Sequence, residues 1–344
     1  MGVKILPGYE HVDGWHCGST AIRNACRYVG VEFSEPFCFG LGAGAGFFFL
    51  KSNHSSPSRI FNGRSAALVP PFFNHLGLPF EWRTGDEFDW PAMRACLDEG
   101  LPIILLADIF YLPYYRSSTH FPGHVVLLAG YDEISGLAYL SDTDRHRLRT
   151  VSLAALDKAM VSKQPPFLME HNWREIHPFK SPDLGEPIRR ALRANVEQML
   201  HPPAPFLGLS ALQALAADLP AWGEVDDWQW CARFGYQVIE RRGTGGGAFR
   251  HPLYSRFLQE AEAWLPELAE MEAAARMTAI GRQWTILALS LKKISEQDEP
   301  DGFLEAGEIA QEIAELETAF WVELDSIGLQ AGAAVDHKSP NHSI

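Results

Sequence analysis

The run Val125-Val126-Leu127-Leu128-Ala129-Gly130-Tyr131 is followed by the turn Asp132-Glu133-Ile134-Ser135-Gly136 and by a second run, Leu137-Ala138-Tyr139-Leu140. Two such runs around a turn that contains glycine predict an antiparallel β-hairpin. The first run does not alternate with polar residues, which indicates a strand buried on both faces. A third run, at 103–109, predicts another strand, so we expect a sheet in this part of the chain.

Amphipathic helices are predicted around this sheet. Two sets of apolar residues recur at helical spacing: Ala21, Ile22, Ala25 and Val29, and then Trp90, Met93 and Leu97 after an N-cap at Asp89. The character of the chain changes near residue 180, after a segment rich in proline and glycine. Beyond it, helices are predicted at 188–200, 209–218, 225–241, 253–274, 275–294 and 303–327.

The expected fold class is therefore α+β, with an antiparallel-sheet domain followed by an all-α domain. The first domain spans residues 1–180 and the helical domain residues 181–327. Residues 328–344 form a tail that we expect to be disordered.

The composition limits the classes of partner. The formal net charge of −14 disfavours nucleic acid and suits a cationic small molecule. An acidic protein partner needs a local basic patch, and 145–149 and 189–193 are candidates, although such patches taken alone are more often solvated faces of helices and loops. The apolar runs are far shorter than the roughly 20 residues that cross a bilayer. The N-terminal residues lack a signal-peptide pattern, so we expect a soluble cytoplasmic protein without a membrane partner. The oligomeric state stays open, with a homodimer among the options.

The five cysteines form no CxxC pair, so neither a disulfide framework nor a zinc site is predicted. Cys17 differs from the others because it lies in His16-Cys17-Gly18-Ser19-Thr20, at the start of a predicted helix. Backbone N–H groups and the helix dipole lower the pKa of a thiol there. Cys17 is therefore the candidate nucleophile, and a buried structural thiol is the alternative.

His124 and Asp142 are candidates for the base and for the group that orients it. His124 opens the first hairpin strand and Asp142 follows the second, so the antiparallel hairpin brings them to the same end. Asp144 is a substitute if the register slips. Among the other histidines, His120 precedes Phe121-Pro122-Gly123, which argues against a helical metal site. His11 lies near Cys17 in the chain and is a candidate oxyanion donor, or else a surface histidine.

Four stretches in the first half resemble the N-terminal domain of the butirosin biosynthesis protein H family. They are 16–24 around Cys17, Ser34-Glu35 with Phe39-Gly40-Leu41-Gly42-Ala43-Gly44, Asp108-Ile109-Phe110-Tyr111-Leu112-Pro113-Tyr114, and His120-Phe121-Pro122-Gly123-His124 running to Asp132. The second half is similar to the helical domain that accompanies this family, at 242–250 and at Tyr254-Ser255-Arg256-Phe257-Leu258.

This resemblance implies a papain-like fold related to C39 peptidases. It also implies an acyltransferase that moves an acyl group from the phosphopantetheine thioester of an acyl carrier protein to an amine. In butirosin assembly, the acceptor is an aminoglycoside. No tightly bound cofactor is expected. Cys17, His124 and Asp142 match the cysteine, the histidine and the acid of the family, whereas His11 stands where papain-type enzymes usually have glutamine.

Substrate-binding roles are assigned to residues around these three. Gly18 adjoins the nucleophile, and Tyr111 belongs with Phe47, Phe48, Phe49, Tyr114 and Tyr115 to the aromatics that can line a dry cleft or pack a core. The loop Gly243-Thr244-Gly245-Gly246-Gly247 leads to Arg250, and its N–H groups and the guanidinium are candidates for holding the pantetheine phosphate. The alternative is a simple turn whose arginine pairs with a glutamate. A cysteine peptidase or amidase, or a binding module without activity, remain the rival functions.

Overall fold

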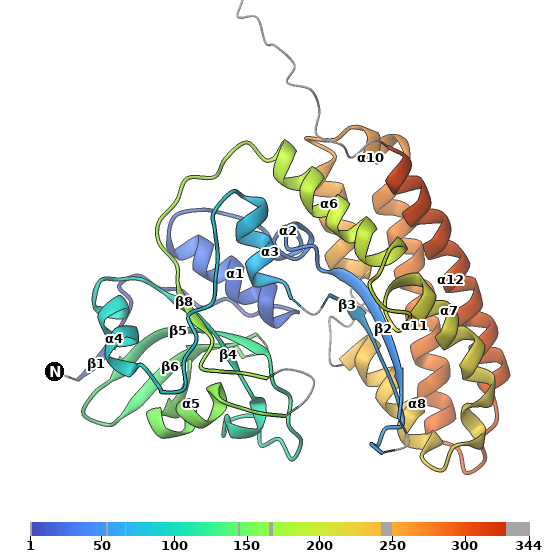
Figure 1. Cartoon of the computed structure of the whole chain (residues 1–344), viewed down its shortest axis with the longest axis horizontal. Helices are drawn as coiled ribbons and strands as arrows, with labels where there is room; N and C mark the ends of the chain where they lie inside the picture. The colour runs from blue at the N-terminus through green and yellow to red at the C-terminus, as the bar shows by residue number, and fades with distance from the viewer. Residues whose placement is uncertain are drawn as a thin grey trace, which may run out of the picture.

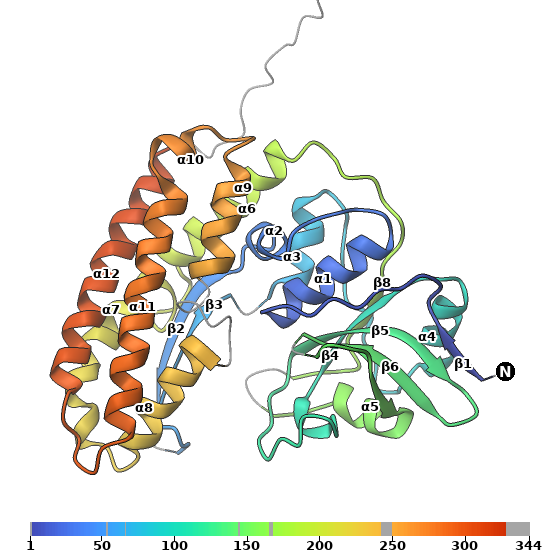
Figure 2. The ribbon, with the colours of Figure 1, turned by 180° about the vertical axis from the view of Figure 1, so that it is seen from behind.

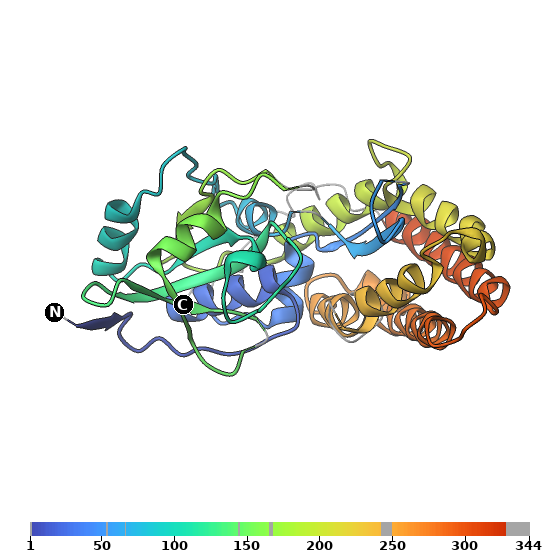
Figure 3. The same cartoon turned by 90° about the horizontal axis from the view of Figure 1, so that it is seen from below.

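The computed structural model describes residues 2–52, 54–65, 67–143, 145–164, 168–241 and 250–327. Two bodies lie side by side (Figure 1). The sheet body contains the large sheet with its helices, and the helical body contains the helices of the second half. Figure 3 shows the two bodies end to end, with the N-terminal strand at the far edge of the sheet body. The fold is α+β, as expected from the sequence.

The large sheet has antiparallel pairings throughout. Its order is β7 (Arg149–Ser152), β6 (Leu137–Ser141), β5 (His124–Asp132), β4 (Ile103–Ala107) and β8 (Trp173–Glu175), and β1 (Val3–Ile5) also pairs with β5. The predicted hairpin and the strand beside it are confirmed as β5, β6 and β4. Every residue of β5 is buried, as the uninterrupted apolar run indicated.

Gly130 allows β1 to join this sheet. A Cβ atom at this position would lie 2.4 Å from the carbonyl oxygen of Lys4, so the β1 backbone could not approach a larger residue so closely.

The helices of the sheet body cover the strands. They are α1 (Cys17–Tyr28), α4 (Trp90–Asp98), α5 (Leu153–Met160) and the short η1 (Ile109–Tyr111). Ala21, Ile22 and Ala25 are buried, and α1 packs mainly on β5. The side chain of Asp89 accepts a hydrogen bond from the Ala92 N–H, which confirms the predicted N-cap of α4.

The helical body consists of the second half of the chain. Its elements are α6 (Gly185–Leu200), α7 (Gly208–Asp218), η2 (Leu219–Glu224), α8 (Trp228–Tyr236), η3 (Gln237–Arg241), η4 (Arg250–Tyr254), α9 (Ser255–Ala261), α10 (Glu267–Glu270), α11 (Ala273–Ser295) and α12 (Phe303–Ser326). The predicted single helix at 253–274 is wrong, because helix α9 ends at Ala261. Pro266 lacks the N–H that a continuous helix needs, and Glu272 has a left-handed backbone with φ of 54°.

A hairpin from the first half of the chain packs on the helical body. This hairpin, β2 (Ala45–Lys51) and β3 (Arg59–Arg64), lies beside α7 and α8 in Figures 1 and 2. The rings of Phe47 and Phe61 lie 5.7 Å and 6.1 Å from that of Trp284, and Phe49 stacks on Trp222. Phe47 and Phe49 are therefore core residues and do not line a cleft.

Two short helices connect the bodies. Helix α2 (Glu35–Leu41) packs on α1 of the sheet body and on α9 of the helical body, and α3 (Val69–His75) packs on α6. The view in Figure 2 shows α2 and α3 between the two bodies. None of the described helices is both long and apolar enough to cross a membrane. Asp144, Gly245 and the tail 328–344 lie outside the described residues.

Candidate functional site

Cys17 is the first residue of α1. His16 caps this helix, because its Nδ1 atom accepts a hydrogen bond from the Ser19 N–H at 3.2 Å. The first N–H groups of a helix have no partner within it, so those of Cys17 and Gly18 are oriented toward the region in front of the thiol. The Cys17 side chain is partly buried. The position combines access with the positive end of a helix dipole.

A buried carboxylate holds the segment before Cys17. Glu35 accepts hydrogen bonds from the N–H groups of Trp15 and His16 at 2.9 Å and 2.8 Å, and from the Thr20 hydroxyl at 3.0 Å. A Cβ atom on Gly14 would lie 2.4 Å from Glu35 and still closer to Thr20, so this turn admits only glycine. The Ser34-Glu35 motif was visible in the sequence, but its role in positioning Cys17 was not predicted.

His124 and Asp142 meet at the end of the β5–β6 hairpin. The Nε2 atom of His124 lies 2.8 Å from Oδ1 of Asp142, and both side chains are almost fully buried. The Thr143 N–H donates to the same carboxylate oxygen. The predicted pairing of these two residues is thus present in the structure.

Two tyrosines complete this arrangement. Tyr114 donates a hydrogen bond to Oδ2 of Asp142 at 2.7 Å, and the Tyr115 hydroxyl lies 3.1 Å from Nε2 of His124. Because Nε2 faces Asp142 and Tyr115, Nδ1 is the ring nitrogen that can face Cys17. From the sequence, these tyrosines were candidates for lining a cleft or packing a core, since nothing in their spacing links them to Asp142.

The Cys17 thiol and the His124 ring lie close enough for each to shift the pKa of the other. Burial raises the pKa of Cys17, but the hydrogen bond and charge of His124, with smaller effects of Arg64 and the Val125 N–H, bring this pKa down to about 7. Burial lowers the pKa of His124, whereas Asp142 and Cys17 raise it to about 10. At a pH between these two pKa values, Cys17 is a thiolate and His124 is an imidazolium.

The charge of Asp142 is maintained by its neighbours. Burial raises the pKa of this carboxyl, but the charge and hydrogen bond of His124 and the hydrogen bond of Tyr114 together hold it below its ordinary value. Burial, Arg64 and His124 lower the pKa of His16, so this ring is neutral and accepts the cap hydrogen bond. His16 therefore does not compete with His124 for the proton of Cys17.

His11 is engaged away from the thiol. Its Nδ1 atom lies 2.7 Å from the Ser141 hydroxyl, and its Nε2 atom contacts the Arg145 carbonyl oxygen. With both ring nitrogens engaged, the ring has no N–H left for an oxyanion beside Cys17. The structure therefore does not favour the predicted role of His11, and the N–H groups at the start of α1 are better placed for it.

Arg250 also differs from its predicted placement. The guanidinium is fully buried in the helical body, where it forms an ion pair with Glu317 at 2.8 Å. It also donates to the carbonyl oxygens of Gly46 and Gly63 in the β2–β3 hairpin. These partners occupy the guanidinium, so Arg250 connects the hairpin to α12 and does not face a phosphate.

Tyr111 and His120 lie on the loop between β4 and β5. Nδ1 of His120 lies 2.7 Å from Oδ2 of the buried Asp108, and the Tyr111 ring lies 5.6 Å from the His120 ring. Asp108 also accepts from the Ser162 hydroxyl and the Phe121 N–H. This cluster holds both ends of the loop that carries Tyr114 and Tyr115.

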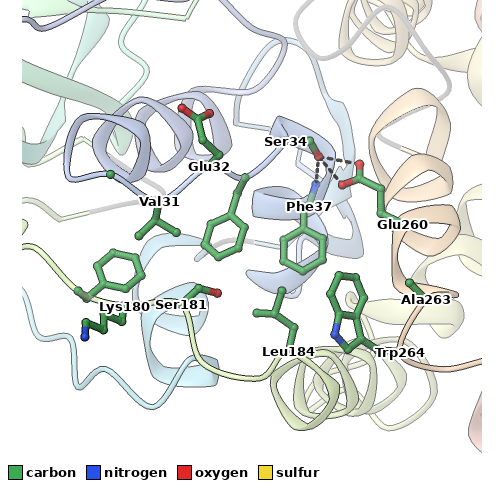
Figure 4. Close-up of a pocket in the computed structure, with 13 residues that line it drawn as sticks. Val31, Glu32, Ser34, Phe37, Lys180, Ser181, Leu184, Glu260, Ala263 and Trp264 are labelled. Atoms are coloured by element: carbon green, nitrogen blue, oxygen red, sulfur yellow. Dashed lines mark hydrogen bonds between the residues drawn. The ribbon is translucent and has the colours of Figure 1, made fainter.

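A separate cavity of about 680 Å³ lies where the two bodies meet. Figure 4 shows Phe37, Leu184 and Trp264 along one side of it and Glu260 beside Ser34. The Ser34 hydroxyl is within 2.9 Å of both Glu260 oxygens, and burial raises the pKa of this carboxyl. In the part of the chain that the structure describes, no cluster of histidine, cysteine and acidic side chains could hold a metal ion.

Comparison with known families identifies the family of the region that contains this site. Residues 16–143 match the family model described as butirosin biosynthesis protein H, N-terminal. This region of the chain belongs to this family. Cys17, His124 and Asp142 all lie within the part that matches the butirosin biosynthesis protein H model. Residues 154–324 match a domain of unknown function, DUF4872, which covers most of the helical body. No curated protein sequence matches the chain.

Proposed function

We propose that this member of the butirosin biosynthesis protein H family is a cysteine-dependent acyltransferase of natural-product biosynthesis with a papain-like, C39-related sheet body. The donor is the phosphopantetheine thioester of an acyl carrier protein, and the acceptor is an amine of a small molecule. The observation that carries the proposal is the series Cys17, His124 and Asp142: Nε2 of His124 lies 2.8 Å from Oδ1 of Asp142, and His124 lowers the pKa of the Cys17 thiol, within residues 16–143 that match this family. Such a series activates a thiol for acyl transfer.

In the first half-reaction, the Cys17 thiolate attacks the thioester carbonyl. The N–H groups of Cys17 and Gly18 at the start of α1 donate to the oxyanion that develops. The carbon–sulfur bond of the donor then breaks, and the imidazolium of His124 gives its proton to the departing pantetheine thiolate. The products are an acyl-Cys17 thioester and the free thiol of the carrier.

The acyl-enzyme changes the basicity of His124. The Cys17 thiolate is one of the groups that raise the pKa of His124, and acylation removes its negative charge. The pKa of His124 therefore falls after the first step, and the neutral ring becomes available to take a proton from the acceptor amine. The amine nitrogen attacks the thioester, Cys17 leaves as a thiolate, and an amide is released.

The acceptor class is supported by charge. A chain with a formal net charge of −14 attracts cationic molecules, and an aminoglycoside-like or polyamine acceptor carries several ammonium groups. The butirosin protein of the family name belongs to the biosynthesis of such a compound. No nucleic-acid or membrane partner is proposed, and we propose that the protein acts in the cytoplasm.

Hydrolysis is the rival reaction, because water and an amine can attack the same acyl-enzyme. Intact-mass spectrometry with acyl-pantetheine and acyl-carrier thioesters tests the first step. We expect one acyl adduct on the wild-type chain and none on Cys17→Ala. A wild-type chain that stays unmodified across a broad donor panel would contradict the proposal. Addition of polyamines or aminoglycosides to the adduct should then yield an amide faster than a free acid. A cysteine hydrolase would instead release the acid at a rate independent of amine.

A further inference from the structure

A second cavity is lined in part by Tyr114, the residue that donates a hydrogen bond to Asp142. It has a volume of about 710 Å³, and its walls include Tyr114, Arg116, Arg147 and Arg149. The Tyr114 side chain connects this cavity to the candidate active site, because it lines the cavity and donates a hydrogen bond to Asp142 at 2.7 Å. A molecule held in the cavity is therefore separated from Asp142 by one side chain.

The strand register directs Arg149 to the same side of the sheet as Asp142. Arg149 pairs with Leu140 between β7 and β6, and residues directly opposite in an antiparallel pair point to the same face. Asp142 lies two residues after Leu140, so its side chain continues on that face. The guanidinium of Arg149 lies 5.8 Å from the centre of the Tyr114 ring.

The arginines of this cavity have spare hydrogen-bonding capacity. The Nε–H of Arg149 is buried and has no hydrogen-bond partner in the described part of the chain. Arg116, Arg147 and Arg149 form no ion pair with any carboxylate among the residues that the structure describes. In contrast, Arg23, Arg59 and Arg250 each contact a carboxylate. Three guanidinium groups that contact no carboxylate within the described ranges, in a strongly acidic chain, make this cavity a site for an anion.

We propose that this cavity binds a phosphate group, the one carried by the phosphopantetheine arm of the donor. The inference rests on the acyl transfer proposed above and adds a recognition site to it. Planar guanidinium groups match phosphate oxygens with paired hydrogen bonds, and the buried Nε–H of Arg149 would gain a partner. The cavity in Figure 4 is unsuited to this group, because Glu32 and Glu260 line it.

Titration calorimetry on the full chain tests the proposal without any reaction. The ligands are 4′-phosphopantetheine, pantetheine and inorganic phosphate. We expect phosphopantetheine to bind about tenfold or more tightly than pantetheine. Arg147→Ala should bring this ratio close to one, and because Arg147 is exposed this change does not endanger folding. Arg149→Lys should lower the ratio partially. Arg282→Ala removes the same charge from the exposed surface of α11 and should leave the ratio unchanged.

Two outcomes of the calorimetry overturn the proposal. One is equal affinity of the wild-type chain for phosphopantetheine and pantetheine. The other is inorganic phosphate binding as tightly as phosphopantetheine, because the cavity would then be a general anion site. Acylation of Cys17 is measured separately with phosphorylated and unphosphorylated acyl donors. Selective phosphopantetheine binding without an acyl adduct would reject the proposed acyltransferase activity but support the phosphate site. Adducts formed equally fast from both donors would support the acyltransferase activity but reject the phosphate site.

Discussion

His124 and Asp142 are in contact because β5 contains one extra residue opposite β6. The register shifts between the pairs Gly130–Tyr139 and Leu128–Leu140, which leaves Ala129 as the inserted residue of a β-bulge. Continued past Ser141, the shifted register puts Asp142 opposite Val126, on the same face as His124. Without the bulge, Asp142 would point to the other face. The distance of 2.8 Å between Nε2 and Oδ1 depends on this irregularity.

Replacement of Asp142 by asparagine should therefore slow acylation of Cys17 by about 100-fold. The charge of Asp142 raises the pKa of His124, and its loss leaves the thiolate with a weaker cationic partner. Stopped-flow measurement of acylation by a thioester donor gives the rate. The matched control is Asp157→Asn, which makes the same change at the His171–Asp157 pair, 2.9 Å apart and remote from Cys17. Similar losses in both variants would contradict the role of Asp142.

The pH dependence of thiol alkylation should distinguish Cys17 from Cys96 in the same sample. The rate follows the thiolate, so it rises as the pH passes through the pKa of each thiol. For Cys17 we expect the half-maximal rate near pH 7, whereas burial raises the pKa of Cys96 above its ordinary value. Iodoacetamide labelling with peptide mass spectrometry measures both. In Asp142→Asn the Cys17 midpoint should move up while that of Cys96 stays. A Cys17 midpoint above that of Cys96 in the wild type would exclude the thiolate–imidazolium pair.

Glu35→Gln should reduce the acylation rate by about tenfold to a hundredfold with little change in donor binding. The glutamine keeps the size of the side chain but presents one acceptor oxygen in place of two, so the N–H groups of Trp15 and His16 lose a charged partner. The segment before Cys17 is then less firmly held. The control is Glu32→Gln, an exposed change nearby. An acylation rate equal to that of the control would mean that Glu35 does not position Cys17.

The sequence predicted the local elements of the site better than their relative placement. The strand β5 and the helix after Cys17 could be predicted because burial determines which positions are apolar: a continuous run in β5 and a helical spacing in α1. The bulge at Ala129 has no such pattern, because an alanine in a buried strand looks the same whether or not it has a partner. Asp142 and Asp144 could not be separated by sequence alone for a different reason, because residues two apart in a strand share a face.

Long-range packing was the other part that the sequence did not predict. Nothing in Phe47 or Phe49 indicates that their hairpin leaves the sheet body and packs on Trp284 and Trp222. The partner of Arg250 was equally open, since a guanidinium after a glycine-rich loop is suited to a phosphate or to a glutamate. Burial decides between them, and burial depends on contacts between residues far apart in the chain.

Arg250→Ala should lower the free energy of unfolding by about 3–5 kcal/mol. The change leaves Glu317 as a buried charge, and its remaining partners, the indole N–H groups of Trp284 and Trp321, do not neutralise it. Two carbonyl oxygens of the β2–β3 hairpin also lose their donor. Urea unfolding followed by tryptophan fluorescence measures the loss. Arg276→Ala, which breaks an exposed ion pair with Glu323, should cost less than about 1 kcal/mol. If Arg250 instead faced a ligand, its removal would weaken donor binding and leave the unfolding midpoint near that of the control.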